Sequence, residues 1–368
     1  MSDSGKNEDD KKEVDNGKEL INALLESIRQ KKKINLVAYV DDPSCDNHQQ
    51  NLPDHQESAK RTKIIRKALI RHGMTKLMER TGSISVKKSD LTSVHDKDYV
   101  EEVFTCGKHN KPMSLSEPSS DTSMNDVGSL EAILASVASV MGAVDTVCGK
   151  HGIENKNGRY NSNRIRKVFC NIRPPGHHAH VKKGAGFCFM NNVVIGANLA
   201  MTKYSSIIKK VLIFDWDLHH GDGTEDIVKN NPNIMYISFH RGGEGKDRFY
   251  PFTGLDYKND SGNVYNFPIT SDETAESYMQ KFYQSMKLAY KFAPDMVMIS
   301  AGFDSHKDDM YHALPLDYIH FHEMTKALAK LADNQASGRL VSVLEGGYTL
   351  DVLYKSVLVH VATLIDGY

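Results

Sequence analysis

Two histidine pairs and several aspartates stand close together in two short segments of the sequence. The first, 173–179, reads Arg-Pro-Pro-Gly-His-His-Ala, and the second, 215–223, reads Asp-Trp-Asp-Leu-His-His-Gly-Asp-Gly. Alternate residues of an extended chain point to the same side, so Asp215, Asp217 and His219 can share one side of a strand end. Carboxylates and an imidazole together suit a divalent metal such as zinc. The spacing therefore predicts the centre of a metal-dependent hydrolase.

A further acidic group follows an apolar run in the segment 300–306, Ser-Ala-Gly-Phe-Asp-Ser-His. With Asp304, the residues Asp217 and His219 offer two oxygens and one nitrogen, which leaves room for water and is typical of an open catalytic site. A lone Asp-x-His is more often a capping pair than a metal site. The third ligand and the neighbouring histidine tandem favour the metal.

The sequence also contains candidate residues for proton transfer and for binding an oxyanion. His177 and His178 can act as proton acceptor and donor if each imidazole has its second nitrogen held, and Asp215 and Asp222 are carboxylates available to do so. The segment Glu-Gly-Gly-Tyr ends at Tyr348, whose phenol can stabilise an oxyanion that develops on a substrate carbonyl.

Strands that alternate with helices must position these side chains. Continuous apolar runs predict strands at 34–40, 167–172, 210–217, 234–240, 264–269, 296–302 and 340–345. Helical periodicity fits 58–72, 128–148, 189–203, 274–292, 317–332 and 351–366. The pattern predicts one α/β domain over 19–368, with a mainly parallel β-sheet flanked by helices on both faces. Ligands gather beyond the carboxyl ends of such strands, where the candidate residues fall.

Polar segments interrupt this pattern. Residues 1–18 are charged and lack an apolar period, so we expect them to be disordered, with a short helix over 19–30. The stretches 107–127 and 149–166 are expected to be loops.

Composition limits the classes of function. The chain has 368 residues and a formal net charge of −1, which argues against a globally basic nucleic-acid binder. Its 5 cysteines form no CxxC pair and are expected to be reduced thiols of an intracellular protein. We find no apolar signal region and no uninterrupted apolar run of membrane-spanning length.

Taken together, the chain resembles the zinc-dependent histone deacetylase family, closer to class II than to class I, within the arginase/deacetylase superfamily. The similarity covers roughly 34–368. Five motifs in the same order carry it: RPPGHHA at 173–179, GFCFMNN at 186–192, DWDLHHGDGT at 215–224, SAGFDSH at 300–306 and LEGGY at 344–348. Single short motifs give false matches, but five in order make coincidence improbable.

The resemblance implies hydrolysis of N-ε-acetyl-lysine in histones or other proteins. It makes Asp217, His219 and Asp304 the ligands of one zinc ion and Tyr348 the oxyanion donor. It pairs His177 with Asp215 and His178 with Asp222 as the general acid/base machinery. It further implies a tunnel for the acyl-lysine and a structural potassium ion. The tunnel residues are Gly186, Phe187 and Tyr250, with Tyr311 and Asp98 at its rim, and the potassium ligands are Asp215, Asp217, His219, Ser238 and Phe239.

Some positions depart from the family pattern. Class II members usually carry asparagine where this chain has Asp222, which alters the basicity expected of His178. The first-loop motif His-Pro-Glu reads His-Gln-Glu at 55–57, and Phe252 stands where glycine is common. Tyr311 occupies the position at which a glutamate marks polyamine deacetylases, which weakens that interpretation.

Other functions stay open at this point. A deacetylase of acetylpolyamines or other small amides would keep the chemistry and change the rim. An arginase-like enzyme needs more carboxylates for a second metal than we can place. An inactive acetyl-lysine-binding scaffold would lack a ligand, a histidine or Tyr348, and none is missing. The family implies acetylated protein substrates, corepressor-type partners and a place in the nucleus or cytoplasm, with roles in chromatin and transcription.

Overall fold

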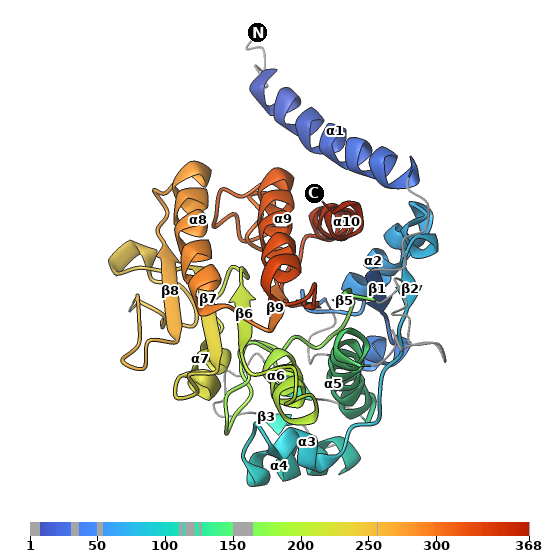
Figure 1. Ribbon diagram of the computed structural model, residues 1–368, viewed down its shortest axis with the longest axis vertical. Helices are drawn as coiled ribbons and strands as arrows, with labels where there is room; N and C mark the ends of the chain where they lie inside the picture. The colour runs from blue at the N-terminus through green and yellow to red at the C-terminus, as the bar shows by residue number, and fades with distance from the viewer. Residues whose placement is uncertain are drawn as a thin grey trace.

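A β-sheet of eight parallel strands forms the middle of the molecule in the computed structural model (Figure 1). The structure describes residues 8–30, 37–49, 54–109, 113–114, 122–124, 127–149, 165–255 and 257–367. The strand order is β2-β1-β5-β10-β9-β6-β7-β8. The strands of this sheet are β1 (Val37–Val40), β2 (Glu79–Arg80), β5 (Lys167–Cys170), β6 (Val211–Asp215), β7 (Ile234–Arg241), β8 (Val264–Ile269), β9 (Met296–Ala301) and β10 (Leu340–Leu344). Two further strands, β3 (Met113–Ser114) and β4 (Ser123–Met124), pair antiparallel apart from the sheet.

Helices cover both faces of the sheet (Figure 1). The α-helices are α1 (Glu8–Gln30), α2 (Lys60–Arg71), α3 (Lys88–Thr92), α4 (Lys97–His109), α5 (Val127–Cys148), α6 (Asn192–Lys203), α7 (Asp222–Val228), α8 (Ala275–Phe292), α9 (Tyr318–Gln335) and α10 (Leu350–Asp366). Three 3₁₀ turns are η1 (Pro43–Asn47), η2 (Met74–Lys76) and η3 (Gly245–Asp247). One core layer joins the sheet to α1, α2, α8, α9 and α10, and a second joins it to α5 and α6.

The central strands are apolar because both of their faces are covered. Every residue of β6 and of β9 is buried. This is the burial expected of parallel strands between two helical layers. The predicted α/β fold with a parallel sheet and helices on both faces is therefore confirmed, and each of the seven predicted strands is present, although residues 34–36 lie outside the described part of the chain.

Helix α5 is apolar on all sides because it lies in the core. By length and composition its segment Gly128–Cys148 could cross a membrane, and it is the one such helix among the described residues, but 83% of that window is buried inside the fold. It packs against α6, α4 and the sheet. A helix that is apolar all round is expected at such a position.

The start of the chain differs from the prediction. Residues 1–7 lie outside the described residues, whereas α1 begins at Glu8, well before the helix expected over 19–30. The disorder expected for residues 1–18 stays a prediction. Lysine and glutamate are good helix formers, so a polar segment can extend a helix that is anchored elsewhere. The anchor is the apolar stripe that includes Ile21, Leu25 and Ile28, which packs on α10 and α9.

Several short elements were not predicted. Helices α3 and α7 and the strands β2, β3 and β4 are short, so their local periodicity is weak. Helix α4 was also missed, although its 13 residues make it slightly longer than the predicted helix α2. The predicted loops at 107–127 and 149–166 fall largely outside the described residues. The cysteines form no disulfide among the described residues; four of them are buried and Cys106 is half-buried.

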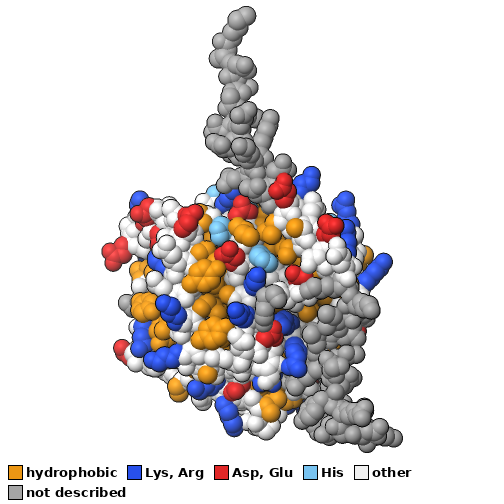
Figure 2. Space-filling view, turned by 45° about the horizontal axis from the view of Figure 1, so that its top comes forward, with side chains coloured by type: hydrophobic (Ala, Val, Ile, Leu, Met, Phe, Trp, Pro, Cys, Tyr) orange, Lys and Arg blue, Asp and Glu red, His pale blue; other side chains and the backbone are white. Residues whose placement is uncertain are grey.

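Charged side chains of both signs are mixed over the face drawn in Figure 2, with hydrophobic side chains gathered in patches between them. This mixture agrees with the formal net charge of −1.

Candidate functional site

The candidate residues lie in the loops that follow four neighbouring strands in the centre of the sheet. The strands β5, β10, β9 and β6 are adjacent and parallel, so their carboxyl ends share one edge. Each strand is followed by chemistry-bearing side chains: His177 and His178 after β5, Tyr348 after β10, Asp304 after β9, and Asp217 and His219 after β6. Segments far apart in the chain therefore meet at one place.

Asp217, His219 and Asp304 form a buried cluster that can hold a metal ion. Nδ1 of His219 lies 3.2 Å from Oδ1 of Asp217 and 3.2 Å from Oδ2 of Asp304. Ligands about 2.0–2.1 Å from a tetrahedral zinc ion lie roughly 3.3 Å apart, so these separations fit such an ion. Oδ2 of Asp304 is buried and accepts no hydrogen bond from the described residues, which leaves it available as a ligand.

Backbone groups hold both carboxylates in place. The amide of Gly346 donates to Oδ2 of Asp217 at 2.7 Å, and the amide of Leu218 donates to Oδ1 of Asp304 at 3.0 Å. A Cβ atom at position 346 would lie 2.2 Å from the Asp304 carboxylate, so only glycine fits this close approach. Burial and the nearby charge of Asp217 raise the pKa of Asp304, as expected of two carboxylates that share one site.

The first dyad lies behind the cluster. Nδ1 of His177 is 3.1 Å from Oδ2 of Asp215, and the same oxygen accepts a hydrogen bond from the hydroxyl of Tyr236 at 2.9 Å. Burial lowers the pKa of His177, but the carboxylates of Asp217 and Asp215 outweigh it and raise that pKa well above its ordinary value. His177 therefore favours the charged form.

The second dyad has the opposite character. Nδ1 of His178 is 2.7 Å from Oδ1 of Asp222, and its ring lies 4.1 Å from that of His177 between centroids. Burial, followed by the charge of His177, lowers the pKa of His178 to about 4, although Asp222 opposes the shift. Two adjacent histidines thus differ in protonation because their surroundings differ.

Glu345, which was not among the predicted site residues, fixes the loop that carries the histidines. Its Oε2 accepts hydrogen bonds from the amides of Gly176 at 2.7 Å and His177 at 3.2 Å. Burial raises the pKa of Glu345 to about 7, against the influence of His177. Through these hydrogen bonds, Glu345 links the LEGGY motif at 344–348 to the RPPGHHA motif at 173–179.

A buried network of charges supports the Tyr348 segment. Arg61 donates to the carbonyls of Gly347, at 2.7 Å, and Glu345, and its guanidinium lies 4.9 Å from the Tyr348 ring centroid. Glu57 pairs with Arg61 at 3.3 Å and with Arg173 at 2.7 Å. All three charged side chains are fully buried. Because the network ties the first loop to the last strand, it sets where the phenol stands.

A narrow cavity of about 340 Å³ leads to the cluster. Its lining includes Gly186, Phe187, Tyr250, Tyr311 and Tyr348, together with His178 and His219. Gly186, Phe187 and Tyr250, which were predicted to form the tunnel, and Tyr311, which was predicted at its rim, all line this cavity. The ring of Phe187 stands at 82° to that of Tyr348, with centroids 6.0 Å apart. A cavity with aromatic walls and a polar end suits an aliphatic stem that carries a polar group.

The rim position expected for Asp98 stays a prediction, and two residues that line the cavity were not predicted. Asp98 is exposed at the start of α4 and is not among the residues that line the cavity. Phe249 and Gln56 line the cavity, and neither was proposed to do so. Phe249 stacks on the His219 ring at 5.4 Å, and Gln56 donates to the Tyr311 hydroxyl at 2.5 Å. Two signals in the sequence could have identified them. Phe249 directly precedes Tyr250, and Gln56 belongs to the His-Gln-Glu segment that departs from the family pattern.

Two of the residues expected to hold potassium, Asp217 and His219, also belong to the metal-binding cluster. Asp215, the last residue of β6, is the register partner of Ser238, which lies within β7. Ser238 and Phe239 are buried. The hydroxyl of Ser238 also lies 2.8 Å from Nδ1 of His240.

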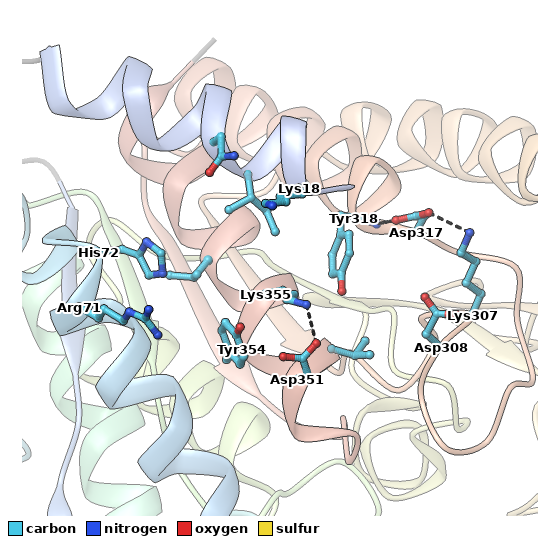
Figure 3. A pocket seen from close by; sticks show the side chains of 14 residues that line it. Lys18, Arg71, His72, Lys307, Asp308, Asp317, Tyr318, Asp351, Tyr354 and Lys355 are labelled. Carbon is cyan, nitrogen blue, oxygen red and sulfur yellow. Dashed lines mark hydrogen bonds and ion pairs between the residues drawn. The ribbon is translucent and has the colours of Figure 1, made fainter. Parts of the chain in front are cut away.

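A larger cavity, of about 800 Å³, lies elsewhere, between α1, α2 and α10 (Figure 3). Ion pairs join Lys355 to Asp351 and Lys307 to Asp317 within its lining. The metal-binding cluster is not among its lining residues. The smaller cavity is therefore the better candidate for a catalytic site, despite its size.

Comparisons with known proteins agree with this geometry. A family model described as "Histone deacetylase domain" matches residues 55–364. "Histone deacetylase 6" of Caenorhabditis elegans is 33% identical over 314 residues, which is 82% of this chain and 31% of that protein. "Histone deacetylase clr3" of Schizosaccharomyces pombe is 30% identical over 332 residues, 85% of this chain and 45% of that protein. The solved structure titled "Crystal Structure of HDA15 HD domain" superposes with a TM-score of 0.78 at 28% identity, covering 91% of this chain and 89% of that one.

The chain spans only part of those curated relatives. It covers between about a third and a half of their length.

Proposed function

Because this chain belongs to the histone deacetylase family, we propose that it hydrolyses the acetamide of N-ε-acetyl-lysine in histones or other proteins, with zinc as cofactor. The observation that carries this proposal is the Asp217–His219–Asp304 cluster at the end of an aromatic cavity, beside two His–Asp dyads. The family membership supports the substrate class, since neither polyamine nor urea chemistry is indicated by the relatives' names.

The ligand set fits zinc. Two carboxylate oxygens and one imidazole nitrogen would hold the ion and leave a position open for water and substrate. When bound, zinc lowers the pKa of water and polarises the substrate carbonyl.

The chain's own residues would move the protons. His178 lines the cavity, so it can reach a water molecule or an amine there, whereas His177 lies behind it. His178, neutral and oriented by Asp222, accepts a proton as the water oxygen bonds to the carbonyl carbon. The C–N bond then breaks, the nitrogen takes a proton, and acetate and free lysine remain. The charged His177, paired with Asp215, stabilises negative charge during these steps.

Tyr348 would bind the oxyanion. Burial raises the pKa of its phenol well above the ordinary value, so the hydroxyl keeps its proton and can donate a hydrogen bond. Phe187 and Tyr250 would enclose the aliphatic stem, and Tyr311 would border the entrance. Asp98, exposed on α4, would contact a substrate only outside the cavity.

A structural potassium ion is also proposed. The carbonyl oxygens of Asp215, Asp217, His219 and Phe239 with the Ser238 hydroxyl would hold it. The support is that Asp215, at the end of β6, is level with Ser238 of β7, and carbonyl and hydroxyl oxygens suit a hard cation.

Partners and location follow from the family alone. We propose acetylated proteins as substrates, corepressor-type partners, and action in the nucleus or cytoplasm on chromatin and transcription.

The test uses purified zinc-loaded protein with an acetyl-lysine peptide and, separately, acetylspermidine. Release of free lysine and acetate from the peptide, lost after chelation and restored by zinc, supports the proposal. Turnover of acetylspermidine alone would assign the chain to small-amide chemistry. Binding of the peptide without turnover of either compound would indicate an acetyl-lysine-binding scaffold.

A further inference from the structure

The carboxylate of Asp222 contacts two imidazoles. Its Oδ1 lies 2.7 Å from Nδ1 of His178, and its Oδ2 lies 3.0 Å from Nε2 of His180. The other ring nitrogen of His180 lies 3.3 Å from Oδ2 of Asp226. Four side chains therefore form a continuous row, and His180 and Asp226 have no part in the proposed reaction.

Local structure explains this row. His178 and His180 are two residues apart on the loop that follows β5, so both can face the same neighbour. Asp222 and Asp226 are one turn apart on α7 and share one face of that helix. The His180 ring fits between the two carboxylates because the loop and the helix lie against each other: the amide of Thr224 donates to the carbonyl of His177 at 3.0 Å.

The row runs from the cavity toward the surface. The exposed fraction of the side chain rises from 4% for His178 to 13% for Asp222, 17% for His180 and 33% for Asp226. Lys229 pairs with Asp226 at 2.9 Å at the outer end. Partly buried charge pairs of this kind keep their geometry better than exposed ones.

The charges along the row strengthen the hydrogen bonds between His180 and the two carboxylates. Burial lowers the pKa of His180, but Asp222 and Asp226 outweigh both burial and the nearby Lys183 and raise it. His180 thus carries positive charge more readily than an ordinary histidine, and a charged imidazole donates from both ring nitrogens. The two histidines likewise lower the pKa of Asp222, against burial.

We infer that His180 is a positioning residue for the general base His178, acting through Asp222. This inference rests on the proposed deacetylase function. A carboxylate held at both oxygens cannot rotate about its terminal bond, so it accepts from Nδ1 of His178 in one fixed direction. That hydrogen bond places the His178 proton on Nδ1 and leaves Nε2 as the proton acceptor. The positive charge of His180 also withholds part of the Asp222 charge from His178.

Three zinc-loaded variants test the positioning role of His180. They are His180→Ala, His180→Gln and a matched control, His72→Ala, at the C-terminal end of α2. Glutamine can still donate one hydrogen bond to Asp222, whereas alanine cannot. We expect His180→Ala to lower kcat on an acetyl-lysine peptide about tenfold with KM within about twofold, because partners of catalytic groups typically contribute on this scale. His180→Gln should recover most of kcat, and His72→Ala should match the parent protein.

A second readout does not depend on turnover. Exchange of the histidine C2 hydrogen, followed residue by residue by mass spectrometry, reports the pKa of His178 in each variant. Loss of the His180 charge should raise that pKa in His180→Ala. An unchanged kcat, or a KM effect alone, would overturn the inference. If both His180 variants lost kcat equally and also had a lower melting temperature than the parent protein, His180 would have only a packing role, and the inference would be overturned.

The proposed function and the inference can fail separately. If the parent protein turns over no acetyl-lysine peptide, the proposed function fails. The exchange measurement then still decides whether His180 acts on His178, because an unchanged His178 pKa in His180→Ala overturns the inference.

Discussion

The floor of the cavity and its rim are built on different principles. The floor consists of buried side chains that follow four adjacent strands, and each carboxylate there has partners of known geometry. We define the rim as the loop residues that neighbour Tyr250 and Tyr311 in the chain, and these include exposed side chains, Phe252 at 54% and Met310 at 51%. Packed surroundings determine the floor, so it is sensitive to small changes, whereas the rim can vary with little effect on the fold.

Both regions contain a phenylalanine in a strained backbone conformation. Phe187 and Phe252 both have a positive φ, 69° and 68°, a conformation that favours glycine. Phe187 is buried in the cavity wall, while Phe252 is exposed beside Tyr250, with ring centroids 6.1 Å apart. The same unfavourable backbone is thus retained at a buried wall position and at an exposed rim position, and only the first has dense packing to hold it.

The largest effect is expected at the floor from Asp304→Asn. An amide is a poorer ligand than a carboxylate, and the change also removes a buried charge of the metal cluster. We expect zinc binding, measured by calorimetry, and deacetylase turnover to be lost together. Asp308→Asn is the matched control, because its side chain is 61% exposed and lies only four residues away. Retained zinc binding in Asp304→Asn would remove Asp304 from the ligand set.

Glu57→Gln should destabilise the support that joins floor and rim. It would leave Arg61 and Arg173 buried without a carboxylate, a change that typically costs about 3–5 kcal/mol. Denaturant unfolding measures the difference in free energy. Burial raises the pKa of Glu57, but Arg173 and Arg61 outweigh it and lower that pKa to about 2. The stabilisation is therefore complete above the ordinary pKa near 4.5 and is lost as pH falls toward 2. The same change at an exposed carboxylate such as Glu244 should show no comparable cost.

Tyr348→Phe should act on chemistry without harming the fold. The ring keeps its contacts with Phe187 and Tyr311, and only the hydrogen-bond donor is lost. Removal of one oxyanion donor typically lowers kcat by about 10²–10³. Steady-state kinetics on an acetyl-lysine peptide measures this, with Tyr354→Phe on α10 as control. A kcat within threefold of the parent value would exclude the oxyanion role.

Acid should weaken the layer beneath the floor. Burial lowers the pKa of His360 to about 3, and its ring packs on those of Trp216 and Phe303, which precede two of the metal ligands. Because the unfolded chain binds a proton near pH 6.5 and the folded chain does not, stability falls as pH drops from 6.5 toward 3. The slope is roughly 1.4 kcal/mol per pH unit for one such group. His360→Gln should flatten this dependence in unfolding curves between pH 7 and 5; an unchanged slope would mean that other groups carry it.

The smallest effect is expected at the rim. Phe252→Gly relieves the positive φ and loses only partly exposed contacts, so the free energy of unfolding should change by about 1 kcal/mol or less. Its buried counterpart Phe187→Gly relieves the same conformation but removes a wall of the cavity, and should lose about tenfold or more in kcat/KM. Equal losses from both changes would contradict the distinction between the buried lining of the cavity and its exposed rim.

Motifs and their order made much of the floor predictable. Asp217 and His219 were recognisable because they follow a buried apolar run at a spacing of two, and Asp304 because it follows another such run. Phe249 and Glu345 were missed, since one is an ordinary aromatic in a loop and the other acts through backbone amides. Asp98 lies outside the cavity lining because the direction of α4 is set by packing and cannot be read from local pattern.

The sequence by itself determined which side chains stand at strand ends, because apolar runs, glycines and motif spacing act locally. It also determined the parallel character of the sheet, since strands and helices alternate along the chain. Tertiary structure alone decided that β10 and β9 lie between β5 and β6, and so brought residues more than 100 positions apart within bonding distance. It likewise decided which carboxylate oxygen faces which imidazole, as Asp222 does between His178 and His180. The physical reason is that the order of strands in the sheet depends on how whole helices and strands pack together. The local periodicity of the sequence does not specify this packing.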